Sequence, residues 1–380
     1  MATDRIKILH LITGLDTGGA EVSLLRLTEA MDRDRFENVV VSLTTLGPIG
    51  TAISERGIKV HAIHMPRSLP TPLALWRLYS LLRTERPGVL QTWLYHSDLI
   101  GLIIGRIARI PTIAWNIRCS DMGKEYRRGI NGLLLYLLAR LSKYPDTVIT
   151  NSHTGQRDHQ AFGYHPKRWV VLQNGFDTAV FKPTESGHSG LRHELGLSDD
   201  TVLIGLVARY DPIKDHKAFL HAAANLLTTH PAIHFVLVGD GIDDDNRALN
   251  QLIDRLGLRT RIHLLGRRED VPKLTSGLDI ATCCSLGEGF PNIVGEAMAC
   301  GVPCVVTDVG DAAQIVGDTG RIVPAGDHHA LAVGWRELIE KGVAGRAELG
   351  RAAIERIRSD FSLAHCVERY QEFFQAISAK

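Results

Sequence analysis

Short apolar runs rich in β-branched residues alternate along this chain with stretches of helical periodicity. Most of the runs are continuously apolar, which is typical of strands buried on both faces of a parallel sheet. The runs form two groups: 6–12, 39–43, 59–63, 89–93, 112–115, 147–150 and 169–172, then 202–207, 234–238, 261–264, 280–283, 304–307 and 320–323. The pattern predicts an α/β protein with two separate series of strands and helices.

The two series are separated by a segment from Asn174 to about Asp200, in which Gly, Pro, Ser and charged residues replace the apolar periodicity. Asn174-Gly175 forms a turn at little cost, so we expect a hinge there. A last periodic stretch follows Ser359-Asp360, a plausible helix cap. Because 380 residues exceed one ordinary core, we predict two domains, 1–175 and 176–360, with a terminal helix, 361–380, packing back on the first.

Charge and cysteine content narrow the class of protein. Lys plus Arg number 43 and Asp plus Glu 42, so no overall field favours nucleic acid, and any anion must be held locally. The six cysteines show neither metal-ligand spacing nor the density of a disulfide scaffold, which favours free thiols. The first residues lack a signal-peptide pattern, and no apolar run approaches the ~20 residues that span a bilayer. We therefore expect a cytoplasmic protein, at most peripheral to a membrane.

The segment 286–296 places Glu288 and Glu296 eight positions apart across a glycine-rich turn that opens a helix. A helix N-terminus offers unpaired N–H groups and partial positive charge to a phosphate. Carboxylates on either side can accept hydrogen bonds from hydroxyl groups. Because a polyol beside a diphosphate is a nucleotide sugar, the segment predicts a nucleotide-sugar site.

Loops that follow strands supply further candidates, since open parallel sheets bind ligands at the carboxyl ends of their strands. Arg209 and Lys214 share one such loop and suit a diphosphate. For an isolated pair, exposure to solvent would be favoured, but their position at the carboxyl end of a strand decides against it. Gly239 follows the next strand, where backbone can approach a ligand closely. Arg268 follows the strand after that, and its side chain could either stack on a base or lie in solvent.

The first half offers a weaker signal. Gly18 and Gly19 lie in a loop between a strand and a helix, which fits a phosphate but also a plain tight connection. His96 and Asn116 each follow a strand and could face a sugar, although lone histidines are often structural.

Taken together, the loops of the second half resemble the donor-binding domain of the GT4 family of retaining glycosyltransferases, and 288–296 resembles its E-x7-E motif. The loop 18–21 and the hinge 173–177 also look like that family's. The resemblance covers nearly the whole chain. It implies a GT-B fold, with two Rossmann-like domains whose parallel sheets face a deep interdomain cleft.

The resemblance also implies roles for single residues. Arg209 and Lys214 would hold the pyrophosphate and assist its departure, Glu288 the donor sugar and Glu296 the ribose. Family members often have a histidine where this chain has Asn116, and His96 is the substitute candidate. The implied catalytic set is Arg209, Lys214, Glu288, His96 and Asn116, and the implied donor-binding set is Gly18, Gly19, Gly239, Arg268, Gly289, Phe290, Asn292, Ile293 and Glu296. No metal is expected, because the cations and a helix N-terminus take its place.

The implied reaction is retaining transfer of a hexosyl or N-acetylhexosaminyl group in cell-surface polysaccharide biosynthesis. The donor would be a nucleotide-diphosphate sugar, with a UDP-sugar favoured, and the acceptor a saccharide or a polyprenyl-linked saccharide. Two carboxylates could also suggest a hydrolase, but across a turn and a helix they would lie too far apart. The alternatives are a catalytically silent sugar-nucleotide binding protein and a GT-B epimerase or phosphorylase, and nothing in the sequence points to a pyridoxal cofactor.

The segment 124–143 combines an apolar stripe with Arg127, Arg128, Arg140 and Lys143. Such a basic amphipathic helix could make weak contact with an anionic membrane, for this protein the inner face of the cell membrane. It could equally cover the first sheet, because its apolar stripe is no wider than core packing needs.

Overall fold

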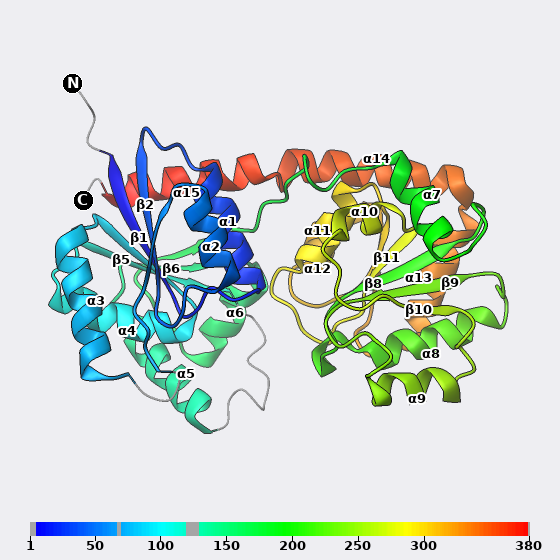
Figure 1. The fold of residues 1–380 in the computed structure, drawn as a ribbon, viewed down its shortest axis with the longest axis horizontal. Coiled ribbons are helices and arrows are strands. Elements are labelled where there is room, and N and C mark those ends of the chain that lie inside the picture. The colour runs from blue at the N-terminus through cyan, green and yellow to red at the C-terminus, as the bar shows by residue number, and fades with distance from the viewer. Residues whose placement is uncertain (1–4, 67–69, 119–128, 379–380) are drawn as a thin grey trace. The chain divides into compact units, whose positions relative to one another are not determined.

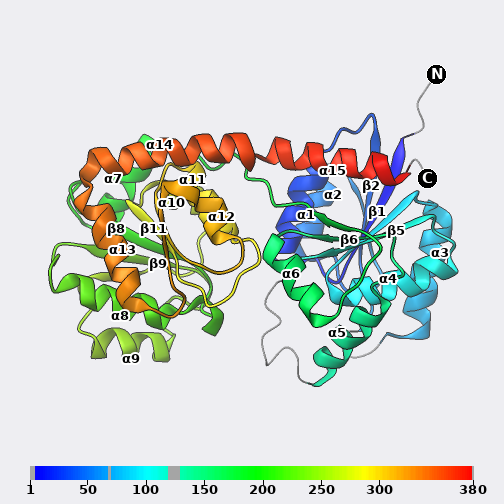
Figure 2. The same cartoon turned by 180° about the vertical axis from the view of Figure 1, so that it is seen from behind.

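The computed structural model describes residues 5–66, 70–118 and 129–378, which form two compact units. Unit 1 comprises Met1–Gly175 and Leu363–Lys380, and unit 2 comprises Phe176–Ser362. Each unit is a parallel sheet with helices packed on its two faces (Figure 1; Figure 2). Both predicted series of strands therefore form Rossmann-like sheets.

The sheet of unit 1 has seven parallel strands in the order β3-β2-β1-β4-β5-β6-β7. The strands are β1 (Ile6–Ile12), β2 (Phe36–Ser42), β3 (Lys59–Ala62), β4 (Val89–Trp93), β5 (Thr112–Ile117), β6 (Thr147–Thr150) and β7 (Trp169–Val171). β2 and β3 are added on one side of β1, and β4 to β7 are then added in sequence on the other side. The point where this direction changes is where such sheets generally bind ligands.

Helices cover this sheet on both sides. They are α1 (Gly19–Ala30), α2 (Gly47–Glu55), α3 (Pro72–Glu85), α4 (Tyr95–Ile107), α5 (Gly129–Leu141), α6 (His153–Phe162) and α15 (Leu363–Ser378). α15 falls within the terminal helix expected over 361–380, and it packs against α1, β1 and β4 (Figure 2). Its side chains Val367, Tyr370, Phe373, Phe374 and Ile377 are buried in the core of unit 1.

The sheet of unit 2 has six parallel strands in the order β10-β9-β8-β11-β12-β13. The strands are β8 (Leu203–Val207), β9 (His234–Val238), β10 (Ile262–Leu264), β11 (Ile280–Cys283), β12 (Cys304–Thr307) and β13 (Arg321–Val323). The direction of building changes between β8 and β11. The loops after these two strands carry the main predicted donor residues.

The helices of unit 2 complete a second doubly covered sheet (Figure 1). They are α7 (Glu185–Glu194), the 3-10 turn η1 (Pro212–Lys214), α8 (His216–Leu227), α9 (Arg247–Arg255), α10 (Val271–Ser276), α11 (Asn292–Ala299), α12 (Ala312–Val316), the 3-10 turn η2 (Gly317–Thr319), α13 (His328–Glu340) and α14 (Gly342–Asp360). Trp335 holds α13 against α8 and β11. Its ring packs edge-on to Phe219 of α8 at 5.0 Å, and its indole N–H donates to Thr282 of β11 (3.0 Å).

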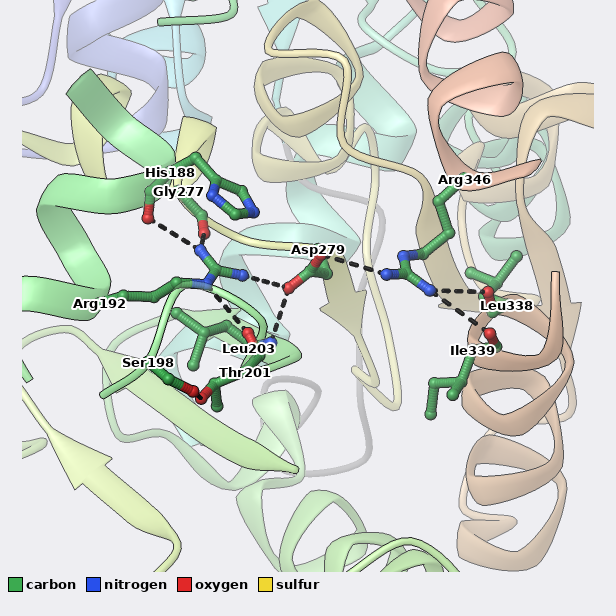
Figure 3. A network of polar contacts seen from close by, with 10 residues as sticks. All are labelled: His188, Arg192, Ser198, Thr201, Leu203, Gly277, Asp279, Leu338, Ile339 and Arg346. Carbon is green, nitrogen blue, oxygen red and sulfur yellow. Dashed lines mark hydrogen bonds and ion pairs between the residues drawn. The ribbon is translucent and has the colours of Figure 1, made fainter. Parts of the chain in front are cut away.

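A buried ionic network joins α7 and α14 through Asp279, the residue directly before β11 (Figure 3). The side chain of Arg192 is fully buried and lies 2.5 Å from Asp279, while three backbone carbonyls accept its other hydrogen bonds at 2.9 Å each. Asp279 also accepts from Arg346 (3.3 Å) and from the backbone N–H of Leu203 (2.8 Å). Burial lowers the pKa of Arg192, and the charge of Asp279 opposes that effect.

The chain enters and leaves unit 2 through neighbouring segments. The backbone N–H of Phe176 donates to the carbonyl of Phe361 (2.8 Å), and Phe176 forms an isolated parallel bridge with Ser362. The entry follows Asn174-Gly175, where the sequence predicts a hinge. Unit 2 is therefore inserted between two parts of unit 1.

Three features narrow the chemistry of the described residues. Cys283, Cys284, Cys300, Cys304 and Cys366 are free thiols, and Cys119 lies outside the described residues. Within 5–66, 70–118 and 129–378, no three His, Cys, Asp or Glu side chains group as a metal site would need. None of the helices described is both long and apolar enough to cross a membrane.

Candidate functional site

The loops at the carboxyl ends of β8 and β11 bring two predicted donor residues into direct contact. Lys214 Nζ lies 2.5 Å from Glu288 Oε1, although the two residues are 74 positions apart in the sequence. Both side chains are largely buried, at 21% and 13% exposed. Because the two loops meet through this ion pair, unit 2 by itself assembles the cation and the carboxylate that the sequence predicts for one site.

Asp211 organises the loop that carries the two predicted cations. Its Oδ1 accepts from the backbone N–H of Ile213 (3.1 Å) and caps the 3-10 turn that ends at Lys214, where Pro212 fits the first helical position. Its Oδ2 accepts from Arg209 Nε (3.1 Å) and Nη2 (2.8 Å). Burial acts to raise the pKa of Asp211, but these hydrogen bonds outweigh it and hold the pKa below its ordinary value. Asp211 thus fixes the side chain of Arg209 within its own loop.

The Glu288 loop is held from both sides. The hydroxyl of Ser285 donates to Glu288 Oε1 (2.6 Å), the same oxygen that contacts Lys214. At the end of β12, the hydroxyl of Thr307 donates to the carbonyl of Ser285 (2.7 Å). Gly310 has a φ of +59°, and a Cβ there would lie 2.4 Å from the carbonyl oxygen of Glu288. Only glycine allows this close approach of the two loops.

The predicted donor residues after Glu288 differ in burial: Phe290 is buried, and Gly289, Asn292, Ile293 and Glu296 are partly buried. The Gly289 carbonyl accepts from the backbone N–H of Asp311 (2.9 Å). Asn292 is the first residue of α11, while Ile293 is partly buried against the core of unit 2 and Glu296 is half-buried. The ring of Phe290 is buried, so only the backbone of this residue could reach a ligand.

The reason for the burial of Phe290 is aromatic packing. Its ring stacks on Phe176 at 5.9 Å with an interplanar angle of 16°, and it lies 6.0 Å from the ring of Phe361. Both partners belong to the segments through which the chain enters and leaves unit 2. The predicted donor-binding residue Phe290 is therefore part of the core beneath the loop.

Gly239 and Arg268 follow β9 and β10. A Cβ on Gly239, whose φ is +153°, would lie 2.1 Å from the carbonyl oxygen of Ala208, so the β9 loop packs directly on the start of the Arg209 loop. Arg268 forms ion pairs with Glu194 (2.5 Å) and Asp270 (2.7 Å), and these raise its pKa above the ordinary value. The guanidinium of Arg268 is thus already engaged by two carboxylates.

In unit 1, the predicted glycine loop leads directly into α1. Gly18 is extended and precedes the helix, and a Cβ on it would lie 2.3 Å from the carboxylate of Glu21. Glu21 therefore folds back over the loop, and burial raises its pKa. Gly19 is the first residue of α1.

The two candidates for the role of the family histidine differ in exposure. Asn116 is fully buried in β5, and its amide donates to the hydroxyl of Tyr370 on α15 (3.2 Å). His96 is exposed in the first turn of α4. The structure therefore leaves His96 accessible and uses the Asn116 amide as a tie between the sheet and α15.

An aromatic and cationic cluster lies beside Asn116. The guanidinium of Arg118 lies 5.0 Å from the centre of the Trp93 ring and donates to Tyr370 (3.3 Å) and Asn174. These residues border a small cavity of about 20 Å³ that also touches Arg26. Arg118 thus links β5 to α15 and to the predicted hinge.

His10 on β1 contacts this cluster through Trp93. The indole N–H of Trp93 can only donate, so His10 Nδ1 accepts that hydrogen bond (3.3 Å) and the proton is on Nε2, which donates to Asn38 (3.0 Å). Burial lowers the pKa of His10 to about 4. The imidazole is therefore neutral and fixed in one tautomer.

Sequence reasoning did not single out Asp211, Ser285, Thr307 or Gly310. For Asp211 a local signal existed, because Asp before Pro is a frequent start of a helical turn. The contacts of Ser285, Thr307 and Gly310 connect loops after different strands, and the order of residues along the chain does not show them.

Comparisons with known proteins define the class. A model described as "Glycosyl transferases group 1" matches residues 201–341, and one described as "Glycosyltransferase Family 4" matches residues 17–180. The chain is 25% identical over 325 residues to the "Putative glycosyltransferase EpsF" of Bacillus subtilis strain 168, covering 81% of this chain and 80% of that one. It is 26% identical over 316 residues to the "UDP-Gal:alpha-D-GlcNAc-diphosphoundecaprenol alpha-1,3-galactosyltransferase" of Escherichia coli, covering 80% of each.

A solved structure agrees over almost the whole chain. HepE of Anabaena, crystallised in complex with UDP, superposes with a TM-score of 0.85 at 26% identity, covering 97% of this chain and all of that one. Other structures of HepE contain UDP with glucose, or UDP-glucose. The fold is GT-B, and the class is that of glycosyltransferases with two Rossmann-like units. The two models, which match different parts of the chain, and the relatives above identify it as a glycosyltransferase like those of family 4.

Proposed function

We propose that this glycosyltransferase takes its sugar from a UDP-sugar and transfers it with retention of configuration to a saccharide acceptor. The observation that carries the proposal is the contact of Lys214 with Glu288, at the sheet edge where Arg209 and the start of α11 also lie. Cations, a carboxylate and a helix N-terminus at one edge suit a diphosphate joined to a polyol. Glu296 on α11 is assigned to the ribose and Glu288 to the transferred sugar.

The charge pattern supports a mechanism in which the two cations assist departure of the nucleotide. In the structure, Arg209 is bound to Asp211 and Lys214 to Glu288. A bound diphosphate would draw on both cations, and its negative charge grows as the glycosidic bond breaks, so their stabilisation increases in the transition state. The acceptor hydroxyl attacks from the face that the nucleotide leaves, and a phosphate oxygen takes its proton. This scheme requires neither a metal nor an organic cofactor.

The choice of UDP rests on relatives. HepE is crystallised with UDP and with UDP-glucose, and the Escherichia coli relative is named for transfer from UDP-Gal. We infer that the transferred group is a hexosyl or N-acetylhexosaminyl group. Of the two candidates near the acceptor, we assign His96 to the sugar, because it is exposed at the carboxyl end of β4.

The acceptor is proposed to be a polyprenyl-linked saccharide used for surface polysaccharide at the inner membrane face. The Escherichia coli relative is named for a diphosphoundecaprenol acceptor. On α5, Leu133, Tyr136 and Leu137 are exposed at 68%, 52% and 40%, and on α4, Ile103 and Ile107 are exposed at 49% and 60%. Exposed apolar groups on two helices that contact each other favour a lipid surface.

The charges around these apolar groups agree with an anionic surface. The guanidinium of Arg140 lies over the Tyr136 ring (4.8 Å) and the Lys143 ammonium over the Tyr144 ring (5.3 Å). Arg127 and Arg128, which the sequence places on the same segment, lie outside the described residues. Several basic groups must act together, because each contributes only about 1 kcal/mol near an anionic membrane.

The donor assignment is tested by calorimetric titration with UDP-, GDP-, ADP- and dTDP-sugars, followed by transfer assays with a polyprenyl-linked acceptor. Arg209→Ala and Lys214→Ala should each lower turnover more than donor affinity, and by at least tenfold, whereas Lys217→Ala on the exposed side of α8 should change neither. Glu296→Gln should weaken binding of UDP and UDP-sugar alike, and Glu288→Gln only that of the UDP-sugar. Tight donor binding without transfer or hydrolysis would instead indicate a catalytically silent binding protein.

The membrane assignment is tested by sedimentation with vesicles of anionic lipid at low salt. We expect weak, salt-sensitive binding that falls in Leu133→Ser/Leu137→Ser and in Arg140→Glu/Lys143→Glu. Val343→Ser is the matched control, because Val343 is 77% exposed but lies in unit 2. If the wild-type protein does not bind these vesicles and prefers a water-soluble sugar acceptor, the lipid-linked acceptor is ruled out while donor use is unaffected.

A further inference from the structure

We infer that Ser285 is a positioning residue for donor selection, because it fixes the rotation of the Glu288 carboxylate. The inference rests on the proposed function, in which Glu288 contacts the transferred sugar. The hydroxyl of Ser285 donates to Glu288 Oε1 at 2.6 Å, a length typical of a hydrogen bond to a charged carboxylate. Lys214 Nζ lies 2.5 Å from the same oxygen.

Two donors on one oxygen restrict the carboxylate more than either alone. Lys214 has a long, flexible stem and serves the diphosphate in the proposed reaction, so its contact with Glu288 changes when donor binds. Ser285 has a single side-chain torsion and is only 2% exposed. The Ser285 hydroxyl is therefore the partner that can stay in place through the donor-binding step.

The backbone of Ser285 is itself held rigidly. The Thr307 hydroxyl at the end of β12 donates to the carbonyl of Ser285 (2.7 Å) and to that of Cys283 (3.2 Å). Only Cys284 separates Ser285 from the end of β11, so the position of Ser285 is set by β11 and by its neighbour β12. A catalytic or binding group supported in this way keeps its geometry better than one on a free loop.

This arrangement predicts a specific defect when the hydroxyl is removed. In Ser285→Ala, Glu288 keeps its charge and its contact with Lys214 but can rotate, so the sugar-bearing donor should lose affinity while UDP does not. A hydrogen bond to a charged group corresponds to roughly tenfold to hundredfold in binding or rate. A purely structural hydroxyl would instead lower the unfolding midpoint and leave the preference for UDP-sugar over UDP unchanged.

The test is a double-mutant cycle with Ser285→Ala, Glu288→Ala and the double variant. Affinities for UDP and UDP-glucose are measured by calorimetry, together with kcat and KM for donor. Ser285→Ala should reduce the UDP-glucose to UDP affinity ratio about tenfold or more, and should add nothing once Glu288 is Ala. Ser276→Ala is the control, since that hydroxyl donates to the carbonyl of Lys273 and not to a carboxylate, and it lies before β11, at the opposite end of the strand from Ser285.

The outcomes separate the inference from the function on which it rests. If no variant or wild-type protein binds a UDP-sugar, the proposed donor is wrong. If wild type binds it and Ser285→Ala keeps the same affinity ratio, or the two substitutions are additive, Ser285 does not position Glu288. Ser285→Cys retains the shape with a weaker donor, and serves in place of the alanine variant if that variant folds poorly.

Discussion

Replacing Asp279 by alanine should selectively destabilise unit 2. The carboxylate lies between two guanidinium groups, at 2.5 Å from Arg192 and 3.3 Å from Arg346 (Figure 3). Arg192 is fully buried and retains only neutral carbonyl partners after the substitution. The variant therefore leaves the buried charge of Arg192 without its hydrogen-bonded carboxylate and with a second positive charge, that of Arg346, close to it.

Removing one partner of a buried ion pair generally costs about 3–5 kcal/mol, and we expect Asp279→Ala to fall in this range. Domains of this kind are stable by only about 5–15 kcal/mol, so a large part of the stability of unit 2 would be lost. With a urea slope of about 2–3 kcal/mol per molar, the unfolding midpoint of unit 2 should fall by roughly 1–2 M.

Urea unfolding followed by far-UV circular dichroism measures the loss, and amide hydrogen exchange shows whether it falls in unit 2. Asp254→Ala is the matched control, since Asp254 pairs with Arg259 at 2.8 Å on the surface, where solvent screens the charges. Replacing Arg192, Asp279 and Arg346 together by Met, Leu and Met should recover most of the stability, because no uncompensated charge remains. The reasoning is refuted if Asp279→Ala is no worse than the surface control.

A change of pH and one further substitution test the packing of buried residues. Burial lowers the pKa of His10 from 6.5 to about 4, so the contribution of the neutral ring to stability is complete above pH 6.5 and is lost as the pH falls toward 4, by up to about 3 kcal/mol. Urea midpoints and an NMR titration of the imidazole would measure this loss. A urea midpoint that does not change between pH 7.5 and pH 5 would contradict a neutral buried ring. Gly295→Ala should destabilise unit 2 by about 1–3 kcal/mol in thermal unfolding, because the new Cβ would lie 2.1 Å from the ring of Phe176. Helix propensity alone predicts the opposite, a stabilisation of about 1 kcal/mol.

The strands could be predicted from the sequence because a strand buried on both faces is a local signal. β4 (Val89–Trp93), for example, is wholly buried and has the predicted bounds. β2 begins at Phe36 and not at Val39, since its first polar side chains take part in contacts that only the fold creates. Glu37 pairs with Lys7 (2.9 Å) and Asn38 bonds His10 (3.0 Å), both on the neighbouring strand.

The chemical types of the candidate site could also be predicted, since Arg209, Lys214 and Glu288 all follow strands. The contact between Lys214 and Glu288 could not be predicted, because three helices and three strands separate the two residues in the sequence and they meet only in the folded unit. The burial of Asn116 has a similar cause: the Tyr370 hydroxyl that it contacts comes from a helix 254 positions away. Phe290 reads as a loop residue until Phe176 is packed against it.

The insertion of unit 2 between β7 and α15 has a consequence for synthesis on the ribosome. Domains usually fold in order from the N-terminus, but residues 1–175 of unit 1 leave the ribosome without the five buried side chains of α15. All residues of unit 2 have been synthesised once Ser362 is added, whereas unit 1 cannot complete its core until α15 has left the ribosome. A chain that stops before Leu363 should therefore carry a folded second unit and an incomplete first one, with its apolar surface open to chaperones.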